Sequence, residues 1–244
     1  MRMSVVALII TLVCAAGVAS AQSIGVLDWG TTHPEQQPTA SWVGSTGLVL
    51  TPTAFTGATM RVNGGYHRIK TDSSTETVYN ANLALLPDLE LGVARLTNYV
   101  IPDPLGATIG NETIANVKLK LDFASWLKVV GGPDIAVGVW DATDKVNRAL
   151  YIVASKKFSI REKGTLSQFS AHVGFGSTEQ SGGVLDGAFG GIDFAVADGL
   201  LAQVEYDAQH VNAALHYYPT GQFALDVGLV DSNFAWGAVF QTAY

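Results

Sequence analysis

The chain alternates apolar and polar side chains with a period of two residues over most of its length. The last segment shows this clearly, because bulky or apolar side chains stand at positions 236, 238, 240 and 244. The period belongs to a β-strand whose two faces meet different surroundings. Each segment is roughly ten residues long, the length with which a tilted strand crosses a bilayer. The pattern predicts an all-β fold, a transmembrane antiparallel up-and-down β-barrel of about 12 strands.

The spacing of turns and connections fits such a barrel. Short turns at 87–88, 198–199 and 219–221 alternate with longer connections at 99–112, 141–147 and 177–185, as periplasmic turns and outside loops alternate in bacterial barrels. The connections 124–132 and 157–164 are long for periplasmic turns, which leaves open a short helix at 124–128 or a miscounted strand. The first expected strand starts at residue 59, and the others lie at 79–85, 89–98, 115–123, 134–141, 148–156, 166–176, 187–197, 200–207, 210–218, 222–230 and 233–243.

The N-terminus has the three regions of a secretory signal peptide: Arg2, an apolar run at 5–13, and small residues before Gln22. We expect a cleaved signal at 1–21, a periplasmic arm or linker at 22–45 that could also fold into the barrel mouth, and a barrel at 46–244. Cys14 is preceded by Val13, where a lipoprotein signal has a small residue. Cleavage should therefore leave a mature chain without a thiol.

Composition narrows the class of partner. Charged residues make up 14% of the chain and hydrophobic residues 48%, without the long apolar runs of helical membrane proteins. The net charge of −7 disfavours a nucleic-acid partner. We expect location in the outer membrane, with its lipid as partner and with the C-terminal strand, which ends at Tyr244, read by the barrel-insertion machinery. A soluble β-sandwich would need charged outer faces, whereas Phe223, Leu225 and Val227 share a phase without charge.

Polar residues of the opposite phase should line the inside of the barrel. They carry both signs of charge, so they could form a polar path or a salt-bridged filling. Inward glycines such as Gly65 and Gly174 could leave a narrow channel or let the wall bend. The residues expected to line the lumen are Arg61, His67, Glu90, Lys118, Lys120, Asp122, His172, Glu205, His216 and Asp226.

Chemical motifs are weak in this sequence. The five histidines have no metal-ligand spacing, and no local motif joins a serine, a histidine and an acid, although a triad assembled across strands stays open. Asp141, Asp144 and Asn147 lie in one loop but lack the oxygen pattern of a dedicated calcium site. We therefore expect no cofactor, no metal and no enzymatic activity.

Aromatic residues are expected near the strand ends, where amphipathic rings lie at the level of the lipid headgroups. A separate apolar segment at 47–52 (GLVLTP) stops at a proline, which indicates a strand end or edge. The aromatic residues assigned to the two belts are Tyr66, Tyr79, Trp140, Phe175, Tyr206, Tyr217, Trp236 and Tyr244.

Two stretches resemble the YjbH-like family of exopolysaccharide-associated outer-membrane proteins. The first is 47–54 (GLVLTPTA), which is similar to the opening motif of that family, and the second runs through 204–207 (VEYD) and 212–218 (NAALHYY). The resemblance implies an outer-membrane β-barrel linked to the production or export of extracellular polysaccharide, with polysaccharide or export-system proteins as partners. The chain is shorter than full-length members of that family and lacks a credible lipobox.

Two functions follow from these patterns. The first is a narrow transport or export channel linked to extracellular polysaccharide. The second is a non-conducting structural or interaction barrel that presents surface loops or anchors a periplasmic partner. Conductance separates the two functions.

Overall fold

The computed structural model describes residues 41–42, 47–57, 59–72, 74–98, 110–121, 132–159, 168–197 and 199–242. In this part of the chain, no helix is long and apolar enough to cross a membrane. The strands are β1 (Arg61–Lys70), β2 (Thr75–Leu86), β3 (Leu89–Thr97), β4 (Glu112–Leu121), β5 (Asp134–Trp140), β6 (Ala149–Ser159), β7 (Gln168–Thr178), β8 (Gly187–Ala197), β9 (Leu200–Tyr206), β10 (Val211–Thr220), β11 (Phe223–Val230) and β12 (Asn233–Gln241).

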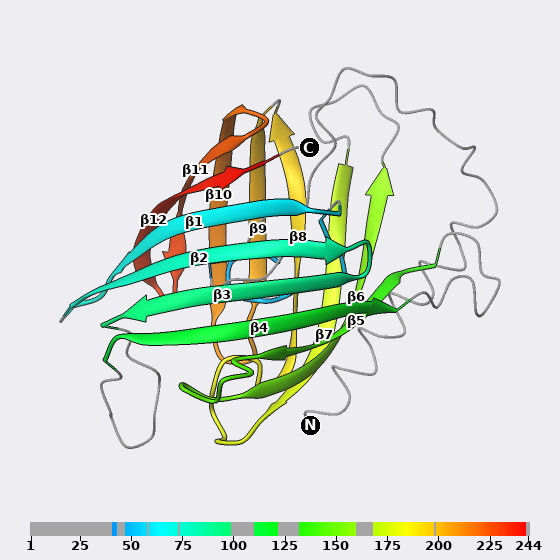
Figure 1. Cartoon of the computed structure of the whole chain (residues 1–244). Helices are drawn as coiled ribbons and strands as arrows, with labels where there is room; N and C mark the ends of the chain where they lie inside the picture. Colours follow the sequence, from blue (N-terminus) through cyan, green and yellow to red (C-terminus); the bar gives the residue numbers. More distant parts are fainter. Residues whose placement is uncertain are drawn as a thin grey trace.

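The strands form one closed antiparallel barrel (Figure 1). Each strand pairs with its neighbours in sequence, and β1 pairs with β12 over Asn63↔Gln241 to Lys70↔Phe234, which closes the ring. The predicted up-and-down barrel and its twelve strands are confirmed. The long connections after β4 and β6 contain no further strand within the described residues. The short helix expected at 124–128 lies outside those residues, as does Asp122.

The barrel has two different ends. Short turns at 87–88 and 221–222, with Gly199, lie at one end, which we call the turn end. The connections at 71–74, 141–148, 179–186, 207–210 and 231–232 lie at the other, which we call the loop end. The strand order puts the turns at 87–88 and 221–222 at one end and the connections at 141–148 and 179–186 at the other, a grouping that the sequence predicts.

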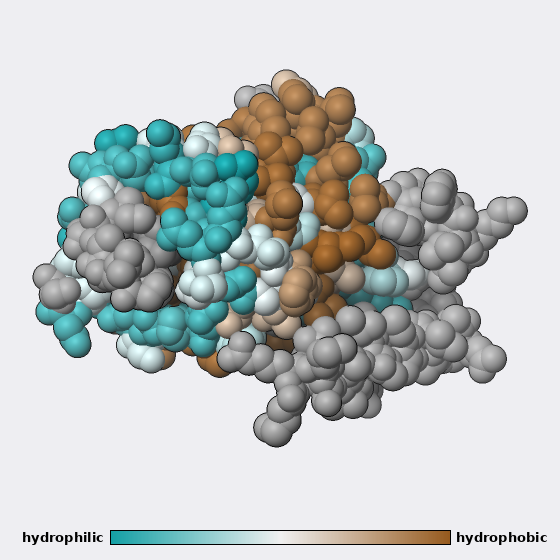
Figure 2. Space-filling model, turned by 90° about the horizontal axis from the view of Figure 1, so that it is seen from below, coloured by the Kyte–Doolittle hydropathy of each residue, from teal (hydrophilic) through white to brown (hydrophobic). Residues whose placement is uncertain are grey.

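The outer face is apolar, as the alternation predicts. On β11, Phe223, Leu225, Val227 and Leu229 are exposed, whereas Asp226 between them is buried. Apolar residues form a broad area on the face shown in Figure 2, and hydrophilic residues gather toward one side of it. A closed barrel with such an exterior is the architecture with which β-strands span a bilayer, because every strand edge is paired.

Inward glycines give room to aromatic rings from the partner strand. Gly174 pairs with Phe189 and Gly138 pairs with Tyr151, and a Cβ atom at either glycine would overlap the ring opposite it. The two rings lie edge to face, with centroids 6.4 Å apart. The space beside these two glycines is thus filled by packing.

Most of the predicted belt residues with a described side chain lie on the outer face, but Trp140 was assigned wrongly. Tyr79, Phe175 and Trp236 are exposed, whereas Trp140 is buried. On β5, Val137 and Val139 have the outward phase, so the next residue along the strand must point inward. Tyr244 lies outside the described residues.

Candidate functional site

A segment that precedes β1 fills part of the lumen. We call Ser41, Trp42 and residues 47–57 the plug. Trp42, Leu48, Val49 and Thr51 are fully buried. The plug forms one isolated bridge, Gly47↔Pro52, and among the described residues it pairs with no wall strand in a ladder. The segment expected to end or edge a strand is therefore a turn inside the barrel, where Pro52 needs no ladder partner.

Glu205 on β9 holds the turn of the plug. Its carboxylate accepts hydrogen bonds from the backbone N–H of Leu50 at 2.8 Å and of Thr51 at 3.0 Å, and from Thr51 Oγ1 at 2.8 Å. Asn212 Nδ2 donates a fourth bond to the same carboxylate at 2.9 Å. A buried carboxylate needs such donors, because charge without partners is costly in a low-dielectric interior. Glu205 therefore ties the plug to the wall over a sequence separation of about 155 residues.

A second contact holds the start of the plug. Trp42 stacks on His67 of β1, with ring centroids 4.7 Å apart and planes 15° from parallel. Asn80 Nδ2 on β2 donates to the carbonyl oxygen of Ser41 at 2.9 Å. Ser41 and Trp42 belong to the predicted arm at 22–45, for which folding into the barrel mouth was left open, and both are fully buried.

A relay across three neighbouring strands holds the end of the plug. The N–H of Ala54 donates to Ser155 Oγ at 2.7 Å, and Ser155 Oγ lies 2.8 Å from His172 Nδ1. The other ring nitrogen of His172 lies 2.8 Å from Asp193 Oδ2, and Phe55 meets the ring edge to face. These polar groups lie in one chain of hydrogen bonds, which strengthens each bond in turn.

The relay brings together a serine, a histidine and an acid, which the sequence left open. Its order differs from that of a nucleophilic triad, where the serine contacts Nε2 and the acid contacts Nδ1. Ser155 is 1% exposed and already accepts a bond from the plug, so its oxygen has no face open to a substrate. These contacts attach the plug to the wall.

A cluster of polar residues lies on the wall at β9, β10, β11 and β1. Asp226 Oδ1 is 2.7 Å from His216 Nδ1, and Asp226 Oδ2 is 3.7 Å from His67 Nδ1. Gln203 Oε1 is 2.8 Å from His216 Nε2. His67 links this cluster to the plug, because its ring stacks on Trp42 and also lies near Asp226.

The remaining predicted lumen residues lie near the turn end of the wall. Lys118 Nζ is 3.3 Å from Glu90 Oε1, and both side chains are buried. Lys120 Nζ is 2.8 Å from Asp134 Oδ1 in a half-exposed pair. Arg61 is buried at the start of β1. The two lysines thus each meet a carboxylate along the wall.

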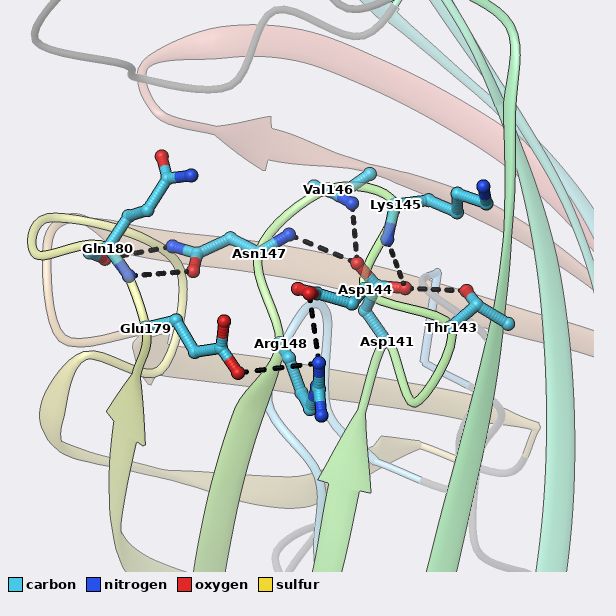
Figure 3. Close-up of polar contacts among 9 residues, drawn as sticks. All are labelled: Asp141, Thr143, Asp144, Lys145, Val146, Asn147, Arg148, Glu179 and Gln180. Carbon is cyan, nitrogen blue, oxygen red and sulfur yellow. Dashed lines mark hydrogen bonds and ion pairs between the residues drawn. The ribbon is translucent and has the colours of Figure 1, made fainter.

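At the loop end of the barrel, polar contacts hold two of the connections in place (Figure 3). The carboxylate of Asp141 accepts bonds from Thr143 Oγ1 and from the backbone N–H of Lys145, Val146 and Asn147, at 2.6 to 3.2 Å. The oxygens of Asp141 bind donors of its own loop, whereas a cation site would direct them toward the ion. Among the described residues, no cluster of metal-ligating side chains occurs. Asp141 therefore shapes the loop.

Two cross-links join this loop to the connection at 179–186. Arg148 pairs with Asp144 at 2.9 Å and with Glu179 at 3.3 Å (Figure 3). The hydrogen bond from Arg148 to Asp144 and the nearby charge of Glu179 raise the pKa of Arg148. Asn147 and the backbone of Gln180 exchange two hydrogen bonds, at 2.9 and 3.1 Å. The two connections therefore form one cap.

Sequence reasoning missed several residues of this site. Ser155, Asp193, Gln203 and Asn212 share the inward phase of their strands with the predicted lumen residues, so periodicity alone could have found them. No local sequence pattern predicts the role of the plug, because its turn bonds to a strand far along the chain.

Comparison with known proteins adds a distant likeness. No family model and no curated protein matches the chain. Among solved structures, a KdgM porin is similar over 75% of this chain and 99% of its own length, with 13% identity and a TM-score of 0.48. OprB of Pseudomonas putida is similar over 75% and 91%, with 10% identity and a TM-score of 0.30. The functional argument therefore rests on the geometry of this chain.

Proposed function

We propose that the protein is an outer-membrane channel closed at rest by its own plug. The apolar exterior and the polar lumen support the location and the channel. The observation that carries the proposal is that the plug adds no strand to the wall, which closes as a ladder of twelve strands without it. The plug can therefore leave the lumen without breaking the barrel.

The contacts that attach the plug to the wall are of a kind that allows its release. Side chains of the wall hold it at three places: Glu205 at the turn, His67 and Asn80 at the start, and Ser155 at the end. Water can replace hydrogen bonds of this kind, and each bond to a charged group contributes about 1.5–3 kcal/mol. With the plug displaced, the lumen presents charged pairs such as Glu90 and Lys118 and favours a polar solute.

The resemblance to YjbH-like proteins supports a finer proposal, that the solute is an extracellular polysaccharide. Deletion of the gene should then reduce the polysaccharide on the cell surface, and a plasmid copy should restore it. Unchanged surface polysaccharide would contradict this cargo and would leave the channel itself open to the conductance test.

Conductance across a planar bilayer tests the channel. We expect rare, brief openings for the wild type and an open probability about tenfold higher for Glu205→Gln, because the amide loses the charge-assisted bonds to Leu50 and Thr51. Glu179→Gln is the matched control, since Glu179 lies in the cap and its ion pair is exposed.

A disulfide that fixes the plug to the wall should have the opposite effect on conductance. Ala54→Cys with Ser155→Cys puts thiols on two residues that are in contact, with Ala54 N and Ser155 Oγ 2.7 Å apart. Cys14 lies in the predicted signal peptide, so no other thiol is expected in the mature chain. The oxidised variant should conduct nothing, and a reductant should restore the openings.

The non-conducting barrel remains the second candidate, and the cap favours it. Arg148 and Asn147 tie the two loops together over the loop end, next to a lumen that already holds the plug. Zero conductance in every variant, including Glu205→Gln with an intact barrel, would contradict the channel and support a barrel that presents this cap to a partner.

A further inference from the structure

In the strands that the structure describes, the charged residues on the outer face of the barrel all have the same sign. In the described strands, the outward phase carries Arg68, Lys70, Arg95 and Lys156, whereas the carboxylates, such as Glu76, have the inward phase. The whole chain has a net charge of −7, so this distribution is opposite to its composition. A cation on the lipid face costs about 2–4 kcal/mol at the bilayer midplane and about 0–1 kcal/mol near the interface. These positions should therefore lie at an interface.

Three of the four cations lie together at the loop end. Lys70 ends β1 and Arg68 is two residues before it, while Arg95 is two residues before the end of β3. β2 lies between these two strands, and its outward residue Tyr79 pairs with Arg95 on one side and with Tyr66 on the other. The three side chains thus share one sector of the barrel.

Aromatic rings form one surface with Arg68 across β12, β1 and β2. The guanidinium of Arg68 lies over the ring of Trp236, 5.9 Å from its centroid. Tyr66 contacts Trp236 with centroids 5.7 Å apart and contacts Tyr79 with centroids 5.1 Å apart. Such rings belong at the level of the lipid headgroups, so they place the guanidinium groups at the same depth.

Both guanidinium groups keep donors for a ligand. Arg95 Nη1 donates to Thr113 Oγ1 at 3.0 Å, which uses one of its five N–H groups. Among the described residues, no carboxylate pairs with Arg68 or Arg95. A guanidinium offers a fork of N–H groups that matches phosphate oxygens. The chemistry of the ligand is therefore a phosphate.

We propose that Arg68, Arg95, Lys70 and the rings of Tyr66, Tyr79 and Trp236 bind the phosphate-bearing headgroup of a membrane lipid at the loop end. This inference rests on the proposed membrane location. The lipid chains would lie against the apolar outer face below the headgroup, and the phosphate would pair with the cations. A free phosphate ion has no apolar part to use that face.

Native mass spectrometry of the full mature barrel in mild detergent tests the site, with phosphatidic acid and phosphatidylcholine as probes. We expect the wild type to retain phosphatidic acid. Arg68→Gln with Arg95→Gln should lower that retention about thirtyfold, since each of the two cations near an anionic headgroup contributes roughly 1 kcal/mol. Lys156→Gln, an outward cation near the other end, is the control and should retain the lipid as the wild type does.

The other outcomes have distinct meanings. If the wild type retained phosphatidic acid and phosphatidylcholine equally, the site would be overturned. The site would also be overturned if the double variant retained as much phosphatidic acid as the wild type. Full displacement of phosphatidic acid by inorganic phosphate would overturn a lipid as the source of the phosphate. Arg68→Lys with Arg95→Lys keeps the charge without the fork and should retain an intermediate amount. Failure of the barrel to enter phosphatidylcholine vesicles would contradict the proposed membrane location itself.

Discussion

Lys118 and Glu90 form a buried pair across β3 and β4, with their atoms 3.3 Å apart. Sequence periodicity places both side chains inside the barrel but does not say that they face each other. The register makes them direct partners, Glu90↔Lys118. Removing one partner of such a pair leaves a charge without compensation, which typically costs about 3–5 kcal/mol.

Charge reversal at Lys118 should therefore destabilise the barrel. We expect Lys118→Glu to lower the temperature at which the folded band disappears on a gel, because two carboxylates would face each other in the wall. The double variant Glu90→Lys with Lys118→Glu restores opposite charges and should recover most of that loss.

Lys120→Glu is the matched control. Lys120 is 28% exposed and its partner Asp134 is 40% exposed, so water screens the new repulsion. Equal loss of stability in the Lys118 and Lys120 variants would contradict a special role for the buried pair.

At the scale of an element, the loop at 141–148 depends on one carboxylate. Asp141 itself has a positive φ of 51° and accepts hydrogen bonds from three backbone N–H groups of its own loop. The N–H groups of the buried Val146 and Asn147 would otherwise be unsatisfied. The cap is thus organised from within before the salt bridges of Arg148 link it to the next connection.

Asp141→Ala should open the loop to proteases while leaving the barrel intact. The variant loses the acceptor for several donors, so we expect cleavage within 141–148 to become at least tenfold faster, measured by limited proteolysis and mass spectrometry. Asp144→Ala removes only one partner of the exposed ion pair with Arg148 and should change the rate little. Similar rates for both variants would show that Asp141 does not organise the loop.

At the scale of the whole molecule, the barrel and the plug are separate sources of stability. The wall closes through ladder hydrogen bonds between all neighbouring strands, whereas the plug contacts it mainly through side chains. A closed barrel without free edges should resist mild detergent until it is heated.

Purified outer membranes should accordingly give a band on a gel that shifts on boiling. Glu205→Gln should shift in the same way, because it loosens the plug and leaves the ladder unchanged. A protein that is soluble in the periplasm and shows no shift would contradict the membrane location. A shift in the wild type that disappears in Glu205→Gln would show that the wall needs the plug.

The sequence by itself determined which residues face outward and which face the lumen. A strand has a side-chain period of two, so the phase of Phe223, Leu225 and Val227 assigns Asp226 to the inside without any tertiary information. Local turn signals between such segments also predicted about 12 strands, the number that the structure has. Trp140 shows the limit, because a residue at a strand end was assigned by its type and not by its phase.

The tertiary structure alone decided which inward residues meet. Ring closure sets β1 beside β12, and the plug returns into the lumen to bond with a carboxylate about 155 residues away. The partners Ser155, His172 and Asp193 come from three strands whose register no local pattern states. Hydrogen bonds and ion pairs depend on distances of about 3 Å, and only the folded chain brings residues so far apart in sequence within that range.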